Sequence, residues 1–564
     1  MMKQVMSVLA GLLLFCALGA AQTPSGLDSA TKRSLFRCDE INSGFCTEVN
    51  HSTEYFGHYS GHDEPSLIFY SNRKGSGNNS VYHVTIPTDP PTPPQQDGTG
   101  GTFNFQLHPA FWLGMALCDS QSSPNFTTVC NPDTDANIFD NPDANAPDFI
   151  GHHPGAAFLE LQFYPPGGLN TCSDPTRWCV AMAIFSFGIR DLANQVNNLD
   201  CQRKVGLETL NFAFLTVDGK AQSDANPLNP DIFGQFGVFP GKTFQMNPGD
   251  QLIVALRDTP DGLRVKIDDL TARTHGSMTA SIVNGFAQVD FVPDPDPAQP
   301  SVTCSVTPYA FHPMYATASE HTRVPWAAHS YNIAFTDEIG HFELCDAVNR
   351  EGGRCIKAGV SDPGGPDLDD RSACFSGGFL GLFGLQPIGA CIGGDFDFDG
   401  TPYVDKWPGT GDPVTDALLK PAPIRFTSPL FRDQGDEDGE LHNYRRVAFE
   451  TDLPDIEFLT NPQCDIFGNG CTNPPTGDRF YPIFSTARHE DGCAWQLGGP
   501  HIPGTTDNFG GNSTTEYGDP LFLFFITPID ATHPNGGSIG IVSDYRRVLP
   551  HNPCRNNGDN GSAD

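Results

Sequence analysis

A short segment near residue 160 carries the residue types that a carbohydrate-binding or glycosidase site uses. Over 158–164 the chain reads FLELQFY. Successive side chains of a β-strand point to opposite faces, so every second residue of this segment is expected on one face and its apolar neighbours in the core. Aromatic rings stack against sugars, while carboxylates and amides bind hydroxyls. The residues expected on the sugar-binding face are Phe158, Glu160, Gln162 and Tyr164.

A later segment supplies a second carboxylate. In 286–292 Gln288 and Asp290 are expected on one face, opposite the apolar residues. If this strand lies beside 158–164, Glu160 and Asp290 form a pair. Glycosidases use two carboxyl groups, about 5.5 Å apart in retaining enzymes and about 6.5–9.5 Å apart in inverting ones. We therefore predict a glycoside hydrolase with Glu160 and Asp290 as catalytic residues, the alternative being a water-facing strand without chemistry. The predicted substrate-binding residues are Phe158, Gln162, Tyr164 and Gln288.

Two acidic loops have the spacing of calcium ligands. Carboxylates at every second residue before Gly400 match the start of an EF-hand loop, although Lys406 replaces the usual glutamate at position twelve. We expect a structural calcium ion at one or both loops. The alternative is an acidic turn held by Asx hydrogen bonds. The two ligand sets are Asp395, Asp397, Asp399 and Asp405, and Asp133, Asp135 and Asn137.

Other motifs argue against nucleotide and redox cofactors. The chain has no Walker loop, no H-E-x-x-H and no G-x-G-x-x-G within a βαβ pattern. Residues 536–540 match the letters of a G-x-S-x-G elbow, but a strand-like run follows where a helix is needed, which indicates a turn. Four histidines fall between 312 and 341, namely His312, His321, His329 and His341. A metal site could use them, but we interpret them as scattered loop residues.

Strand signals dominate the elements that must position these residues. The chain has 59 glycines, 49 prolines and only 18% charged residues, which argues against coiled coils and helical bundles. Short apolar or alternating runs bounded by Gly, Pro and Asp predict strands. The strongest runs are 156–164, 178–187, 208–217, 251–257, 263–270 and 286–292. Weaker runs are 330–335, 423–426, 444–450, 521–526 and 539–542.

Two proline-rich breaks divide the chain. One is PTDPPTPPQQDGTGGT at 87–102 and the other is PDPDPAQP at 293–300. We predict an all-β protein with a jelly-roll-like sandwich and a second β-rich, loop-heavy module. The predicted divisions are a segment with Cys and His at 22–102, the sandwich at 103–293, the second module at 301–555 and a polar tail at 556–564.

Three segments resemble concanavalin-A-like sandwiches, the group of many glycosidases, legume lectins and the glutamic peptidases. They are FLELQFYPPG (158–167), MNPGDQLIVAL (246–256) and LRVKIDDLTARTHGSMTAS (263–281). The chain as a whole also resembles large secreted proteins without an assigned function. The resemblance implies a polysaccharide hydrolase, a non-catalytic carbohydrate-binding or adhesive protein, or a glutamic peptidase. The peptidases use a Glu–Gln pair, but Gln precedes Glu there, and Gln288 stands at the position of the catalytic Glu.

Charge and the N-terminus predict an extracellular location. The formal net charge of −35 disfavours a nucleic-acid partner. Lys3 precedes an apolar run from Val8 to Ala20, and small residues follow, which predicts a signal peptide at 1–21. This run is too short to span a membrane, and no later run approaches about 20 apolar residues. We expect a secreted protein without a membrane span whose partner is a polysaccharide.

Cysteine usage supports the same compartment. The chain has 17 cysteines, and removal of Cys16 with the signal leaves an even number. The other cysteines are expected to pair over longer loops, with a connectivity that spacing does not give. Five Asn-x-Ser/Thr sequons predict a glycoprotein, at Asn50, Asn78, Asn125, Asn512 and Asn560. The neighbouring pairs expected to form disulfides are Cys38–Cys46, Cys118–Cys130, Cys172–Cys179 and Cys464–Cys471.

Overall fold

The computed structural model describes strands and turns spread along the chain. Every strand pair among the described residues is antiparallel, and the protein is all-β as the composition predicts. The described residues are 53–55, 58–60, 66–71, 76–88, 110–121, 156–166, 172, 174, 176–187, 201, 204–205, 208–229, 242–290, 304–313, 324–330, 345–348, 355–358, 424–432, 439–444, 446–452, 484–489, 492–497, 519–527, 537–549, 552 and 554.

The larger of two main sheets draws its strands from almost the whole chain. Its order is β25-β26-β22-β3-β16-β5-β6-β7-β8, with β15 paired to β5 and β9 paired to β7. Its strands are β3 (Ser66–Ser71), β5 (Phe111–Cys118), β6 (Ala156–Tyr164), β7 (Trp178–Phe187), β8 (Glu208–Phe214), β9 (Gln245–Met246), β15 (His312–Pro313), β16 (Val324–Ser330), β22 (Arg446–Asp452), β25 (Asp519–Thr527) and β26 (Gly537–Leu549).

The smaller main sheet is built in the same way. Its order is β12-β11-β10-β4-β19-β24-β23, and β20 joins β4 and β21. Its strands are β4 (Asn79–Thr85), β10 (Gln251–Thr259), β11 (Gly262–Asp269), β12 (Thr274–Thr279), β19 (Ile424–Thr427), β20 (Leu430–Phe431), β21 (His442–Asn443), β23 (Phe484–His489) and β24 (Gly492–Leu497).

Short elements complete the described part of the chain. Three two-stranded sheets pair β1 with β2, β13 with β14 and β17 with β18. A 3₁₀ turn, η4 (Ile282–Asn284), ends at Gly285, whose φ of 78° is left-handed. The paired strands are β1 (Thr53–Tyr55), β2 (His58–Ser60), β13 (Ala287–Asp290), β14 (Ser305–Pro308), β17 (Cys345–Val348) and β18 (Cys355–Ala358).

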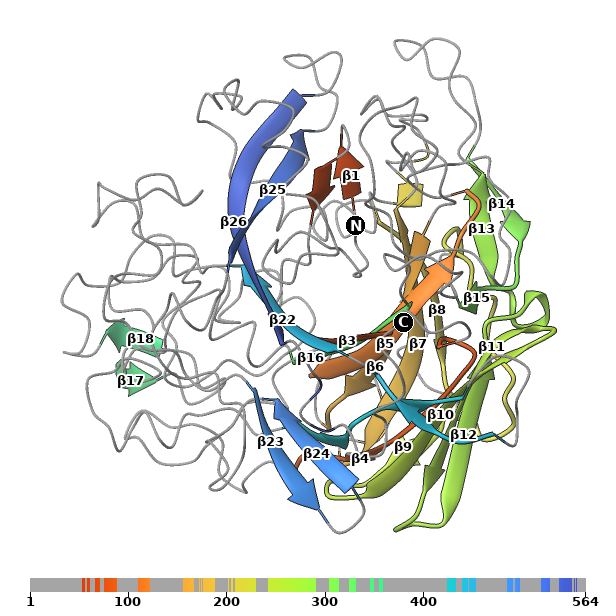
Figure 1. The fold of residues 1–564 in the computed structure, drawn as a ribbon. Helices are drawn as coiled ribbons and strands as arrows, with labels where there is room; N and C mark the ends of the chain where they lie inside the picture. Colours follow the sequence, from red (N-terminus) through yellow and green to blue (C-terminus); the bar gives the residue numbers. More distant parts are fainter. Residues whose placement is uncertain are drawn as a thin grey trace.

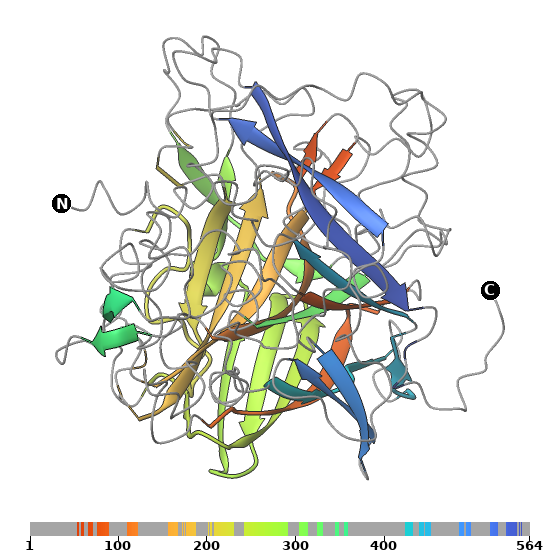
Figure 2. The same ribbon diagram turned by 90° about the vertical axis from the view of Figure 1, so that its left-hand side faces the viewer.

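The two main sheets pack face to face around one core. Figure 1 shows the larger sheet curving from β26 through β22 and β3 to β7, with the smaller sheet against its convex side. The β1–β2 hairpin lies on the concave side, where β2 contacts β25 (Figures 1 and 2). At the centre of the core, the Phe69 ring lies 5.1 Å from Trp495, and the Tyr82 ring lies 4.8 Å from Trp326.

This aromatic core joins segments that the sequence places in different units. Phe69 and Tyr82 come from the N-terminal segment, and Trp326 and Trp495 come from the second predicted module. In the smaller sheet, β4 lies between β10 and β19. The divisions expected from the proline-rich breaks therefore do not coincide with divisions between sheets.

Burial patterns distinguish the two sheets. In β10 and β11 buried residues alternate with exposed or half-buried ones, so the smaller sheet keeps one face toward solvent. In β5 all eight residues are buried, and in β7 those from Trp178 to Ile184 are buried. The middle of the larger sheet is thus covered on both faces.

The strand predictions were right where alternation or apolar runs were clear. β6 and β7 have the predicted bounds, and β10, β11, β19, β22, β25 and β26 overlap theirs. Of the strand expected at 330–335, only Ser330 is described, and it ends β16 (Val324–Ser330), while 331–335 lie outside the described residues. Pro325 discourages a strand prediction for 324–330, because proline cannot donate to the ladder.

Two disulfides are described in full. Cys172 pairs with Cys179, as spacing predicts, and Cys201 pairs with Cys304 over a separation of 103 residues. Cys118 and Cys554 are also disulfide-bonded. The predicted pairs Cys38–Cys46 and Cys464–Cys471 lie outside the described residues, as do Cys130 and residues 1–21.

Candidate functional site

Three polar side chains on one face of β6 are hydrogen-bonded to one another in a row. The neighbours Leu159 and Leu161 point into the sandwich core. On the opposite face Gln162 Nε2 donates to Glu160 Oε2 at 2.6 Å, and Tyr164 Oη donates to Gln162 Oε1 at 2.5 Å. Burial raises the pKa of the Tyr164 phenol well above its usual value, and the charge of Glu160 raises it further. The phenol therefore stays protonated and acts as the hydrogen-bond donor at the end of this row of side chains.

Small residues flank the Glu160 carboxylate on the neighbouring strands. Glu160 lies opposite Gly114 on β5 and opposite Ala183 on β7. At Gly114 even a Cβ atom has no space, since it would lie 1.7 Å from the carbonyl oxygen of Leu159 and 3.1 Å from Cζ of Phe158. The strands on both sides of Glu160 therefore have no large side chains directly beside its carboxylate.

Aromatic rings lie around the part of the sheet next to Glu160. The Phe158 ring packs edge-on against Trp112 with centroids 5.1 Å apart, and His329 stacks on Trp112 at 5.3 Å. On the β8 side Tyr164 packs 5.9 Å from Phe214. We call this surface the Glu160 face, and its residues are Trp112, Phe158, Glu160, Gln162, Tyr164, Phe212 and Phe214.

The Glu160 face lies on the concave side of the larger sheet, because the smaller sheet covers the other side (Figure 1). It is not the open hollow that the sequence suggests. Glu160 is 4% exposed and Gln162 is 6% exposed. Phe185 on β7 and Leu210 on β8 are cross-strand neighbours at the edge of the sheet. Both are only partly buried, so the aromatic surface reaches solvent there.

Asp290 and Gln288 do not join Glu160. β6 is flanked by β5 and β7, whereas β13 pairs with β14, so the two strands do not lie side by side. Asp290 accepts hydrogen bonds from Ser305 at 3.0 Å and from Thr307 at 2.9 Å. The Glu160–Asp290 pair expected from the sequence is therefore not formed.

Gln288 belongs to a second polar cluster, which was not predicted from the sequence. Its Nε2 donates to Asp119 Oδ1 at 2.5 Å, and Ser186 donates to Asp119 Oδ2 at 2.6 Å. Burial raises the pKa of Asp119, although hydrogen bonds from Ser186, Gln121 and Gln288 lower it in part. Ser186 follows Met182 and Ile184 by even steps, so this cluster lies on the core side of the sheet, opposite the Glu160 face. The only sequence signal is an aspartate directly after the apolar run of β5.

The expected calcium ligands belong to segments outside the described part of the chain. Asp133, Asp135, Asn137, Asp395, Asp397, Asp399 and Asp405 all lie outside the described residues. Within the described part of the chain, no group of three or more His, Cys, Asp or Glu side chains is arranged to hold a metal ion.

The histidines that are described have separate roles. His312 Nδ1 lies 2.7 Å from Asp258 Oδ1 and joins β15 to β10. His329 is fully buried on the Glu160 face against Trp112. His321 and His341 lie outside the described residues.

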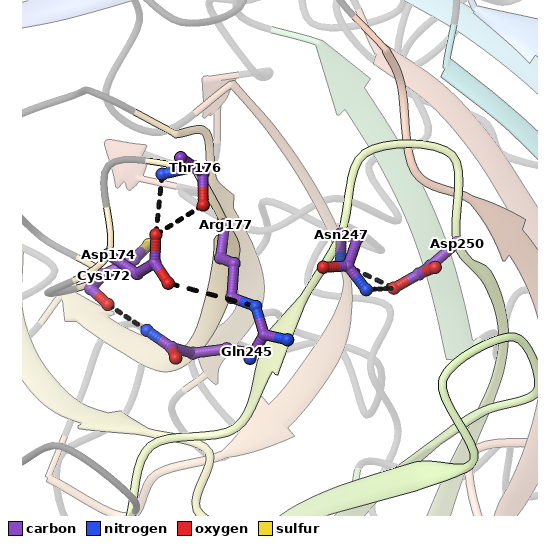
Figure 3. A network of polar contacts seen from close by, with 7 residues as sticks. All are labelled: Cys172, Asp174, Thr176, Arg177, Gln245, Asn247 and Asp250. Carbon is purple, nitrogen blue, oxygen red and sulfur yellow. Dashed lines mark hydrogen bonds and ion pairs between the residues drawn. The ribbon is translucent and has the colours of Figure 1, made fainter.

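A network beside the Glu160 face fixes the loop that leads into β7 (Figure 3). Asp174 accepts hydrogen bonds from the Thr176 hydroxyl at 2.6 Å and from the Thr176 backbone N–H at 2.8 Å, and it lies 4.0 Å from Arg177. These hydrogen bonds, and to a lesser degree Arg177, hold the pKa of Asp174 below its usual value. Gln245 donates to the Cys172 carbonyl and so ties β9 to this disulfide-linked loop.

Comparison with known proteins identifies no relative. No protein-family model matches the chain, and no curated protein or solved structure matches it. In the part of the chain that the structure describes, no helix has the length and apolar character to cross a membrane.

Proposed function

We propose that this chain is a secreted protein that binds extracellular polysaccharide through the Glu160 face. The observation that carries the proposal is the hydrogen-bonded series Tyr164–Gln162–Glu160 on the concave side of a β-sheet, bordered by aromatic rings. Sugar rings are held by aromatic stacking together with a few oriented polar groups. This face combines both kinds of group.

Secretion is part of the proposal. The apolar run Val8–Ala20 after Lys3 has the pattern of a signal peptide. The disulfides Cys172–Cys179 and Cys201–Cys304 support it, because such bonds persist mainly in oxidising compartments.

The geometry favours binding over hydrolysis. A glycosidase needs a second carboxyl group within about 10 Å of the first. Among the described residues, Glu160 is bonded to the carboxamide of Gln162, and Asp290, the carboxylate predicted to pair with it, is held by Ser305 and Thr307 instead. In this proposal Glu160 holds Gln162 in place through their hydrogen bond and has no catalytic role.

Because Glu160 is almost inaccessible, a sugar chain must first meet the aromatic surface where it reaches solvent, at Phe185 and Leu210. The test is glycan-array screening of the purified protein, followed by calorimetric titration with the best glycan. We expect Phe185→Ala to weaken binding roughly tenfold, the equivalent of one lost aromatic contact. Leu270→Ala is the control, since Leu270 is an exposed apolar residue in the turn between β11 and β12, on the smaller sheet's side of the molecule. Equal affinity of both variants, or no glycan bound by the wild type, would refute the proposal.

A second candidate function rests on the contact between Glu160 and Gln162. A carboxyl group bonded to a carboxamide is the pairing that the resemblance to glutamic peptidases implies, and here the two lie 2.6 Å apart. This candidate predicts digestion of denatured protein at acidic pH, insensitive to pepstatin-type inhibitors. Glu160→Gln should abolish that digestion, whereas digestion that survives the substitution comes from another source.

A further inference from the structure

Two buried carboxyl groups meet at the rim of the smaller sheet, away from the Glu160 face. Asp250 is 3% exposed and immediately precedes β10, and Asp269 is 2% exposed and ends β11. The register pairs Asp269 with Leu252, and Asp250 lies two residues before Leu252 on the same face. The two aspartates are therefore diagonal neighbours across adjacent strands, a spacing that long or polar side chains bridge.

The carboxyl group of Asp250 is fixed by its own turn. Asp250 Oδ2 accepts hydrogen bonds from the Asn247 backbone N–H at 2.6 Å and from Asn247 Nδ2 at 3.0 Å (Figure 3). The turn passes through Gly249, whose φ of 85° is left-handed and favours glycine. Asp250 thus presents its other oxygen in a fixed direction.

Asp269 has one satisfied and one unsatisfied oxygen. Its Oδ1 accepts from the backbone N–H groups of Thr271 at 2.9 Å and Ala272 at 2.8 Å. Its Oδ2 is buried and receives no donor from the described residues, while the side chain is within hydrogen-bonding reach of Asp250. Ionised carboxylates only accept hydrogen bonds, so this contact is favourable only when one of the two groups carries a proton.

We propose that Asp250 and Asp269 share one proton in the folded protein. The resulting hydrogen bond holds the 247–250 turn to the β11–β12 hairpin more strongly at acidic than at neutral pH. The proton supplies the donor that Asp269 Oδ2 lacks and removes one of two buried negative charges. This inference is independent of the glycan-binding proposal.

Other charges near the pair do not compensate it. Burial raises the pKa of Asp269, and the hydrogen bond and negative charge of Asp250 raise it further, against the lowering by the two backbone donors. All neighbouring ionisable side chains on the adjoining strands lie on the solvent-facing side of the sheet or in the hairpin turn, and Lys266 pairs with Asp268 at 2.8 Å. These side chains are His83, Lys266, Asp268, Arg273, His275 and Arg425.

The sign of the pH effect follows from linkage. A carboxyl group whose pKa is raised on folding adds stability that is complete below its unfolded pKa of about 3.9 and is lost as pH rises through the folded pKa. Asp269→Asn replaces the shared proton with an amide that donates to Asp250 at every pH. We expect this variant to melt like the wild type near pH 4.5 and to melt higher near pH 8, by a shift on the order of 2 °C.

Melting curves of the full chain across this pH range test the proposal. Asp261→Asn removes an exposed carboxylate from the β10–β11 turn and should show no such trend. If Asp269→Asn fails to fold, Asp250→Asn carries the same expectation. Because other carboxyl groups also absorb at acidic pH, the measurement is an infrared difference spectrum, and acidic wild type minus either Asp250→Asn or Asp269→Asn should show the band of a protonated carboxyl group.

Three outcomes would overturn it. One is a difference between wild type and Asp269→Asn that does not change with pH. Another is an infrared difference spectrum between wild type and Asp269→Asn in which that carboxyl band is missing. The third is a rise in the wild-type melting temperature on adding calcium chloride that Asp269→Asn abolishes, because the pair would then hold a cation rather than a proton.

Discussion

Gly114 lies directly opposite Glu160 across β5 and β6, and the missing side chain at Gly114 allows the two strands to meet. A Cβ atom at Gly114 would lie only 1.7 Å from the carbonyl oxygen of Leu159, which is far inside contact distance. The Phe158 ring also packs close to this position. The backbone of β5 thus sets both the height of the surface beside Glu160 and the position of Phe158.

We predict that Gly114→Ala destabilises the protein by about 3 kcal/mol, because the added methyl group meets backbone rather than a movable side chain. Urea denaturation followed by tryptophan fluorescence measures this change. Ala183→Gly, on the other flank of Glu160, is the control and should cost only about 1 kcal/mol. Equal midpoints for Gly114→Ala and wild type would show that the strands are farther apart than described.

The two described disulfides should differ in their contribution to stability. By the chain-entropy relation, a loop of 103 residues gives roughly 4.7 kcal/mol and a loop of 7 residues gives roughly 2.4 kcal/mol. Replacing Cys201 and Cys304 by serine should therefore lower the free energy of unfolding about twice as much as replacing Cys172 and Cys179. Denaturation midpoints of the two double variants check this order, and a larger loss for the Cys172–Cys179 variant would contradict it.

A fragment comprising residues 103–293 should not fold on its own. It contains β5 and β10 but lacks β16, which pairs with β5, and β4, which pairs with β10. Without these neighbours, apolar residues of the common core are exposed to water. Near-ultraviolet circular dichroism of the fragment should show no fixed aromatic environment, whereas the full chain under the same conditions should. A cooperative thermal transition of the fragment would instead support an independent sandwich domain.

Asp119 and Asp174 should respond to pH with opposite signs. The pKa of buried Asp119 is raised on folding, so its contribution to stability falls as pH rises. Relative to wild type, Asp119→Asn should therefore become less destabilising between about pH 4 and about pH 7. The pKa of half-exposed Asp174 is lowered, so its contribution to stability is complete above about pH 4 and is lost on acidification, and Asp174→Asn should become relatively more destabilising as pH rises from about 2 to about 4. Parallel melting curves measure both trends, and trends of the same sign would contradict the assignment.

Local sequence patterns were sufficient for several elements. The alternation of 156–164 and the apolar run of 178–187 gave the bounds of β6 and β7 without any knowledge of their partners. The same alternation placed Glu160, Gln162 and Tyr164 on one face, where they are hydrogen-bonded in series. The strands β5 and β16 were missed because Gly114 and Pro325 weaken a strand signal.

The sequence by itself determined the all-β class, the short Cys172–Cys179 loop and which side chains of β6 share a face, because these depend on neighbours a few residues apart. Only the tertiary structure decided that Glu160 is buried, that Asp290 lies on another sheet, and that Asp250 meets Asp269. Strand order and the covering of a sheet face depend on contacts between distant segments, such as β4 with β19, and no local pattern of residue types encodes that choice.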